Sequence, residues 1–287
     1  MVNRSGIMKR GLLICLLMFC ALMGMDVAAK TDIVVASFNI RYDNEGDGQN
    51  SWRYRKDYVN SLIRFYEFDI FGIQEGLINQ VRDIERLEEY GRIGVGRDDG
   101  AESGEHAAVF YNKERFEMMD SGNFWLSETP EKPSFGWDAQ CRRICSWGKF
   151  REKNSGEIFF FFSVHFDHIG KKARVESSKL LMSRIKQIAG DMPVVCVGDF
   201  NGTPDSEHIK MLKDGGVLLD SREKSLTPPY GTEGTTSRFD VNDPQESRID
   251  YIFVTPNVSV LKYGTLNEAQ HRRYPSDHFP IMAKLNL

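Results

Sequence analysis

Six apolar runs in this chain present polar residues at one end, and those residues are of types that bind metal ions or move protons. Each has an ordinary structural explanation when taken alone, such as a strand that stops in an Asx turn at Asp199. Together they would form a rim of acids, amides and histidines that repels itself unless a cation is bound. The polar residues are Asn39, Glu75, His165, Asp199 with Asn201, Asp250, and Asp277 with His278.

The ligand types in this rim indicate which metal it would hold. Oxygen ligands without a Cys/His cage favour Mg²⁺ or Mn²⁺ over zinc. Magnesium keeps several waters and is usually completed by the phosphate of a substrate. The predicted chemistry is therefore metal-assisted attack of water on a phosphoester.

The run 193–197 shows most clearly how the fold would position such residues. Its β-branched residues end in Gly198-Asp199-Phe200-Asn201, followed by Gly202 and Pro204. This pattern predicts a buried strand that carries an acid and an amide to its C-terminal end. A period of two would place Asp199 and Asn201 on one face and turn Phe200 into the core.

Alternation and helical spacing predict the remaining elements of a single α/β domain over residues 30–287. The run 157–165 is too hydrophobic to be half solvated, so we expect it at the centre of a covered sheet. The other strands are expected over 33–38, 69–75, 106–112, 116–126, 141–151, 193–199, 248–255 and 276–283. Helices are expected over 52–68, 77–90, 173–189 and 206–213, with loops over 43–51 and 226–242.

The N-terminus has the pattern of a secretory signal peptide over residues 1–29. Lys9 and Arg10 precede an apolar run over 11–24, and small residues lead to a cleavage site after Ala29. A membrane anchor is the alternative, but the run is shorter than the roughly 20 residues that a span needs. We therefore expect export to the periplasm or beyond, with lipidation at Cys20 as a minor alternative.

Charge and cysteine content narrow the classes of partner. The net charge of −4 becomes about −6 without residues 1–29, which carry three basic residues and one acidic residue. Polynucleotide binding usually needs a basic track, and the sequence has none. Cys141, Cys145 and Cys196 are too few and too uneven for a disulfide framework.

The polar ends occur within ordered blocks that resemble the endonuclease/exonuclease/phosphatase superfamily over about residues 32–286. That resemblance implies an α/β (α+β) four-layer sandwich, with two mixed sheets face to face and helices outside. The site would lie at one edge, between the sheets. The blocks are Ser37-Phe38-Asn39, Ile73-Gln74-Glu75, Ser163-Val164-His165-Phe166, Gly198-Asp199-Phe200-Asn201, Arg248-Ile249-Asp250-Tyr251 and Ser276-Asp277-His278-Phe279-Pro280.

The resemblance also implies a role for each residue at the metal. Glu75 would be the principal metal carboxylate, with Asn39 beside it. Asp277 would complete the metal region or steady the neighbouring histidine. The cofactor implied is Mg²⁺ or Mn²⁺.

The implied catalytic residues surround the phosphate. His278, paired with Asp250, would be a general base or a phosphate-binding cation. Asp199 would align or deprotonate the attacking water, and Asn201 would donate a hydrogen bond to phosphoryl oxygens. His165 would stabilise the transition state or the leaving oxygen. Sequence leaves open whether Asp199 or His278 takes the proton.

Further features resemble the secreted bacterial branch of that superfamily, among them Gly104-Glu105 before the strand at 106, and Asp167-His168. Arg41, Arg143 and Arg174 are candidate phosphate clamps, since arginine binds phosphate in a bidentate manner. Solvated surface charge is the alternative for each. The four tryptophans could form an aromatic wall for a substrate ring, although core packing is the better interpretation; they are Trp52, Trp125, Trp137 and Trp147.

The sequence therefore predicts an exported, metal-dependent phosphoesterase, with a small or isolated phosphate substrate favoured by the charge. A secreted nuclease acting on DNA or RNA is the alternative. A lipid phosphodiesterase would need an exposed hydrophobic hairpin, which is not evident. A non-catalytic binding module is remote because Glu75, His165, Asp199 and His278 are all present. We expect a monomer without a stable membrane span.

Overall fold

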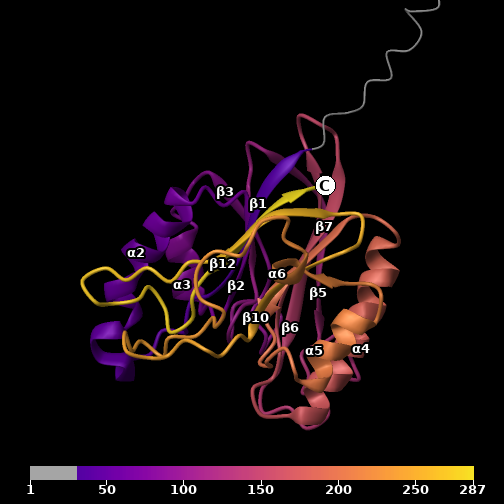
Figure 1. The fold of residues 1–287 in the computed structure, drawn as a ribbon. Helices are drawn as coiled ribbons and strands as arrows, with labels where there is room; N and C mark the ends of the chain where they lie inside the picture. The colour runs from indigo at the N-terminus through magenta and orange to yellow at the C-terminus, as the bar shows by residue number, and fades with distance from the viewer. Residues whose placement is uncertain (1–30) are drawn as a thin grey trace, which may run out of the picture. The chain divides into compact units, whose positions relative to one another are not determined.

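The computed structural model describes residues 31–287 (Figure 1). The predicted signal peptide lies outside these residues. Within them, two mixed sheets of six strands pack face to face. No helix of this part is both long and apolar enough to cross a membrane.

The first sheet has the order β11-β12-β1-β2-β4-β3. Helices α2 and α3 cover its outer face, as the shared cluster of buried side chains shows. Its elements are β1 (Asp32–Asn39), α2 (Trp52–Phe65), β2 (Ile70–Gln74), α3 (Ile78–Ile84), β3 (Tyr90–Ile93), β4 (Val109–Asn112), β11 (Ser259–Thr265) and β12 (Ile281–Asn286).

The second sheet has the order β5-β6-β7-β8-β10-β9. Helices α4 and α5 pack on its outer face, on the side of the sheets opposite α2 and α3 in Figure 1. Its elements are β5 (Phe116–Trp125), β6 (Ile144–Glu152), β7 (Ile158–His165), α4 (Lys171–Ala189), β8 (Val194–Asp199), α5 (Glu207–Asp214), β9 (Leu219–Asp220), α6 (Ser221–Lys224) and β10 (Asp250–Val254).

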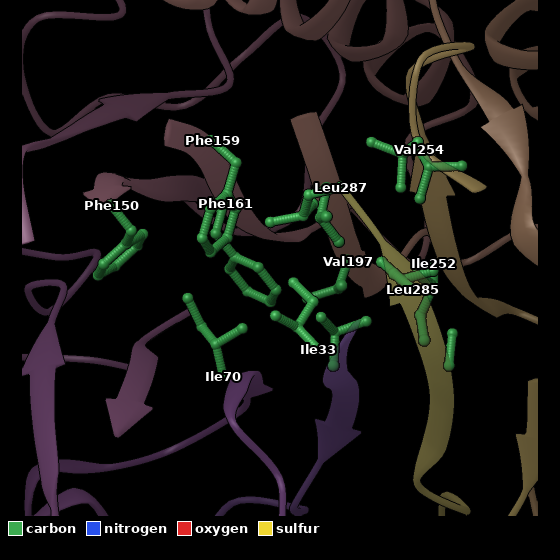
Figure 2. Packing of buried hydrophobic residues seen from close by; sticks show 14 of the residues in the cluster. Ile33, Ile70, Phe150, Phe159, Phe161, Val197, Ile252, Val254, Leu285 and Leu287 are labelled. Carbon is green, nitrogen blue, oxygen red and sulfur yellow. The ribbon is translucent and has the colours of Figure 1, made fainter. Parts of the chain in front are cut away.

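Strand β7 shows how alternation builds the layers. Phe159 and Phe161 point into the core between the two sheets, where they meet Ile33 and Ile70 of the first sheet (Figure 2). The alternate residues Phe160, Phe162 and Val164 face α4 and α5 instead. Both faces of β7 are thus buried, which confirms its predicted central position and the α/β sandwich fold.

Several predicted elements begin or end up to three residues away from their observed bounds, and two are wrong over a longer segment. The segment 276–280 is not part of the last strand, which begins at Ile281. Phe279 N donates to the carbonyl of Thr235, and Pro280 has no N–H for a ladder. The helix expected over 77–90 ends at Ile84, and Tyr90–Ile93 pairs with β4 instead. In both places long-range hydrogen bonds override the local pattern.

Short elements also occur where none was expected. The predicted loop over 43–51 contains a 3-10 helix, η1 (Glu45–Asn50), and strands β9 and β11 and helix α6 had no sequence prediction. Cys141, Cys145 and Cys196 are free thiols.

Candidate active site

Strand register brings the predicted catalytic residues of the second sheet together. His165 of β7 lies directly beside Asp199 of β8, and Asp199 lies beside Asp250 of β10. In the first sheet, Asn39 at the end of β1 lies beside Gln74 at the end of β2. Glu75 then follows β2 directly, so the polar strand ends face one edge of the sandwich.

A polar bridge joins the two sheets beneath this edge. The Ser37 hydroxyl donates to Gln74 Oε1 at 3.3 Å, and Gln74 Nε2 donates to Ser163 Oγ at 3.3 Å. Gly72 allows this close approach, because a Cβ there would lie 2.5 Å from Ser163 Oγ. The bridge thus links β1, β2 and β7 directly beneath the site.

Asn39 links the two carboxylates nearest the centre of the site. Its Nδ2 donates to Glu75 Oε1 and to Asp199 Oδ2, both at 3.0 Å. Glu75 Oε2 accepts from Tyr42 N at 3.1 Å. Glu75 has a φ of 63°, an uncommon conformation for a side chain other than glycine, and such conformations cluster at functional sites.

This acidic centre fits a divalent cation. A carboxylate oxygen of Glu75, one of Asp199 and a ring nitrogen of His278 lie within 4.8 Å of one another, and the two carboxylates are the ligand type that suits a hard divalent cation. Burial raises the pKa of Asp199 to about 7, with Asp250 adding to the shift. Burial likewise raises the pKa of Asp277, and the Glu75 carboxylate adds to that shift. Carboxyl groups that protonate so readily would be stabilised as anions by a bound cation.

His278 is held by an orienting carboxylate, as expected. Its Nδ1 lies 2.9 Å from Asp250 Oδ2, which also accepts from the Thr235 hydroxyl at 2.6 Å. Burial alone would lower the pKa of His278, but Asp250, Asp199 and Asp277 together raise it well above its usual value. His278 Nε2 faces Asp199 Oδ2 at 3.9 Å. A cationic imidazole therefore stands beside the acidic centre.

His165 has the opposite electrostatic character. Burial, with Arg143 and Arg97 next in importance, lowers the pKa of His165 well below its usual value. Its Nε2 lies 3.5 Å from Asp199 Oδ2 and 3.3 Å from Asn201 Nδ2. The site thus holds a neutral and a cationic histidine on two sides of Asp199.

Asn201 reaches this position through a turn rather than through strand alternation. Strand β8 ends at Asp199, and Asn201 has a φ of 48°. Asn201 N donates to Asp199 Oδ1 at 2.9 Å, and its Nδ2 donates to the Phe166 carbonyl at 3.0 Å. The Asx turn at Asp199 is therefore what places Asn201 in the site. Phe200, between them, is buried in the core as predicted.

These groups line a cavity of about 480 Å³. Asn39 and Asp250 are not among its lining residues and act through the residues to which they hydrogen-bond. None of the four tryptophans lines it, and Trp52 and Trp125 are buried in the core. The lining residues are Arg41, Tyr42, Glu75, Arg97, Glu105, Cys141, Arg143, His165, His168, Asp199, Asn201, Asp277 and His278.

The three predicted phosphate clamps lie in different environments. Arg41 lines the cavity, with its Nε 3.0 Å from Asp47 and 3.9 Å from Asp277. Arg143 also lines the cavity but is buried beneath its wall. Arg174 does not line it, and its Nη1 donates to the Asp167 carbonyl at 3.0 Å. The observed contact of Arg174 is therefore with the backbone of a neighbouring loop.

Five cavity residues were not among the predicted site residues. The resemblance of Gly104-Glu105 and Asp167-His168 to family features is the sequence signal that identifies two of them. Tyr42, Arg97 and Cys141 carried none, because loops bring them to the cavity. The five residues are Tyr42, Arg97, Glu105, Cys141 and His168.

Arg55 of α2 supports the site from outside the cavity. It is buried, and its guanidinium donates to four backbone carbonyls, at 2.5 Å to Asn50, 2.8 Å to Ile40, 2.7 Å to Pro275 and 3.2 Å to Arg41. Burial lowers the pKa of Arg55 to about 10. One side chain thus ties the segment after β1, which follows Asn39, to the segment that carries Asp277 and His278.

Solved structures resemble this chain over most of its length. A mannosyl-6-phosphatase of Bacteroides thetaiotaomicron is 42% identical, with a TM-score of 0.85, and the match covers 89% of this chain and 100% of that one. An endonuclease/exonuclease/phosphatase of Bacteroides vulgatus is 43% identical, with a TM-score of 0.87 and coverage of 90% and 100%.

Curated relatives are more distant. Nocturnin of Drosophila melanogaster is 24% identical over 63% of this chain and 32% of its own length. The Ccr4 exoribonuclease subunit of the Mycosarcoma maydis CCR4-Not complex is 21% identical over 91% of this chain and 51% of its own length. The chain thus spans about a third to a half of these relatives. Residues 36–278 match the Endonuclease/Exonuclease/phosphatase family, and the chain belongs to that family.

Proposed function

We propose that this chain is a divalent-metal-dependent phosphoesterase that hydrolyses a small phosphate ester, and that the ester is a sugar phosphate. The observation that carries this proposal is the cavity, in which an acidic centre adjoins a polar region within about 480 Å³. Small-molecule sites have about this volume. The 42% identical relative is described as a mannosyl-6-phosphatase, which supports a sugar ester.

Glu75 and Asp199, with Asp277 nearby, would hold the cation through carboxylate oxygens. A divalent ion bound there would polarise the phosphoryl oxygens and offset negative charge that develops on them. Asn39 keeps the Glu75 and Asp199 carboxylates in place by donating to both. Tyr42 N fixes the second oxygen of Glu75.

Asp199 is the proposed base for the attacking water. A base must be deprotonated to accept the proton of water, and a cation beside Glu75 and Asp199 would keep the Asp199 carboxyl group in that anionic form. His278 remains protonated because of Asp250, so it binds phosphoryl oxygen as a cation instead of removing a proton. The sequence left open whether Asp199 or His278 takes the proton of the attacking water, and we propose that Asp199 does.

Asn201 and His165 act on the other side of Asp199. Asn201 Nδ2 is oriented by the Phe166 carbonyl and donates to a phosphoryl oxygen. His165 is neutral and contributes a ring N–H to the leaving oxygen. Water gives a proton to Asp199 and attacks in line, the bond from phosphorus to the leaving oxygen breaks, and the leaving oxygen takes a proton from solvent, so that the products are phosphate and an alcohol.

The test is phosphate release by the purified protein with Mg²⁺ from mannose 6-phosphate, glucose 6-phosphate and phenyl phosphate. Single-stranded DNA, RNA and bis-p-nitrophenyl phosphate are compared in parallel. Asp199→Asn keeps the size of the side chain and serves as the inactive control. We expect turnover of the sugar phosphates that disappears in the control. Cleavage of DNA or RNA without hydrolysis of any sugar phosphate would favour the nuclease alternative and refute the proposal.

Export remains a separate proposal that rests on the sequence of residues 1–29. Fractionation of cells that produce the full chain should place the mature protein in the periplasm or the medium, with an N-terminus at Lys30. Retention of residues 1–29 on a cytoplasmic product would contradict it.

A further inference from the structure

Part of the cavity wall is not used by the proposed phosphoryl transfer. It lies beyond His165, whose Nδ1 is 3.7 Å from Glu105 Oε2 while its Nε2 faces Asp199. Arg143 and His168 also line this part. A leaving group attached to a phosphate at the acidic centre would extend along this wall.

Arg143 connects the polar groups of this wall from behind. Only 4% of the residue is exposed, and its Nε donates to Asp167 Oδ2 at 3.3 Å. Its Nη2 lies 2.8 Å from His168 Nδ1, and its Nη1 lies 3.9 Å from Glu105 Oε2. Asp167 is itself fixed by the backbone N–H groups of Ile169 and Gly170. This buried guanidinium thus positions His168 by a hydrogen bond and lies close to Glu105 without bonding to it.

The contact with Arg143 determines which nitrogen of His168 carries a proton. Arginine has only donors, so His168 Nδ1 must accept the hydrogen bond and be unprotonated. Burial, with Arg143 next in importance, lowers the pKa of His168, which keeps the ring neutral. The remaining proton is therefore on Nε2. His168 is exposed on the cavity wall and offers this N–H as a donor.

Glu105 offers the complementary acceptor. Its Oε2 is 2.5 Å from Arg97 Nη1, which anchors the carboxylate. Among residues 31–287, its Oε1 accepts no hydrogen bond, and the side chain lines the cavity. The donor His168 is thus held by Arg143 and the acceptor Glu105 by Arg97, and all four residues line the cavity. Neighbouring hydroxyls of a sugar ring can accept from one such group and donate to the other.

We propose that Glu105, anchored by Arg97, and His168, positioned by Arg143, form a leaving-group subsite that binds neighbouring hydroxyls of a sugar ring. This inference rests on the proposed function and adds specificity-determining residues to it. The subsite selects by hydrogen bonding, because a leaving group without hydroxyls leaves the Glu105 oxygen and the His168 N–H unpaired.

The test compares kcat/KM for mannose 6-phosphate and glucose 6-phosphate with kcat/KM for phenyl phosphate, which has no hydroxyl on its leaving group. His168→Phe keeps an aromatic ring without a donor, whereas His168→Gln restores an N–H at about the position of Nε2. We expect His168→Phe to lower the sugar-to-phenyl ratio about tenfold or more. His168→Gln should recover most of that ratio, and Glu105→Gln should lower it.

The sugar-to-phenyl ratio of kcat/KM distinguishes a loss of sugar recognition from a loss of folded structure. A general loss of structure would lower kcat/KM for the sugar phosphates and for phenyl phosphate together. An unchanged ratio in His168→Phe, with the wild type active on sugar phosphates, would overturn the subsite and leave the proposed function intact. The same holds if His168→Gln fails to recover a ratio that His168→Phe has lowered. Wild-type protein that hydrolyses phenyl phosphate but neither sugar phosphate would reject both the subsite and the sugar-phosphate function.

Discussion

Replacing Arg55 by methionine tests whether a single buried cation holds the candidate site together. The substitution removes four hydrogen bonds from a charged donor to the carbonyls of Ile40, Arg41, Asn50 and Pro275. A hydrogen bond to a charged group contributes about 1.5–3 kcal/mol to stability. The loss of stability should be smaller than the sum of four such contributions. The variant no longer has to bury a charge, and the four carbonyls can move to other partners.

We therefore expect Arg55→Met to lower the free energy of unfolding by about 3–5 kcal/mol, a large share of the typical total of about 5–15 kcal/mol. Activity should fall more steeply than stability alone would cause. The segments that Arg55 joins carry Asn39, Asp277 and His278, and a displacement of about 1 Å at such groups can cost about 100-fold in rate.

Urea unfolding near neutral pH measures the first effect, and kcat/KM for mannose 6-phosphate with Mg²⁺ measures the second. Arg55→Lys should be intermediate, since an ammonium group cannot reproduce the planar fork of donors. Arg53→Met, at an exposed position of the same helix, is the matched control. Loss of less than about 1 kcal/mol in Arg55→Met, with kcat/KM close to the wild-type value, would refute this reasoning.

Three other substitutions test the metal centre, the pH dependence and the core. Glu75→Gln should weaken Mg²⁺ binding by about 10-fold or more in isothermal titration, because it removes a charge and sets an amide against the donors Asn39 and Tyr42. Burial lowers the pKa of His208 to about 4 in the folded protein. Between about pH 6.5 and 4 the unfolded chain therefore binds more protons at His208 than the folded protein does, and the free energy of unfolding decreases as the pH falls through that window. His208→Gln should reduce this fall in urea unfolding at several pH values. Phe161→Ala should cost about 3–5 kcal/mol, because the ring is fully buried between the sheets.

Each of these three has an outcome that contradicts it. Magnesium affinity in Glu75→Gln equal to that of Glu88→Gln, at an exposed position, would remove Glu75 from the metal site. Parallel pH profiles of the wild type and His208→Gln would show that His208 does not cause the acid sensitivity. Phe65 is 79% exposed, so Phe65→Ala is the control for the core, and equal losses in the two phenylalanine variants would contradict the packing of Figure 2.

Local patterns predicted the centre of the fold well and its edges less well. The runs at β1, β2, β7, β8 and β10 are apolar enough to be recognised from composition alone, and all five are strands. Strands β3, β9 and β11 are short or edge elements that form because a neighbour offers unpaired backbone groups. That partner is distant in sequence, so periodicity carries no sign of it.

The amino-acid sequence by itself determined which residue types end each central strand, and hence the prediction of a phosphoesterase chemistry that uses Glu75, Asp199 and His278. The alternation of side chains along a strand is a local property, so it does not depend on how the strand pairs with its neighbours. Only the tertiary structure decided which atoms meet, since this depends on strand register and on loops from both sheets. The contacts of Asn201 to His165 and Phe166, those of Arg55 to Ile40 and Pro275, and those of Arg143 to Glu105 and His168 all join residues through such long-range packing.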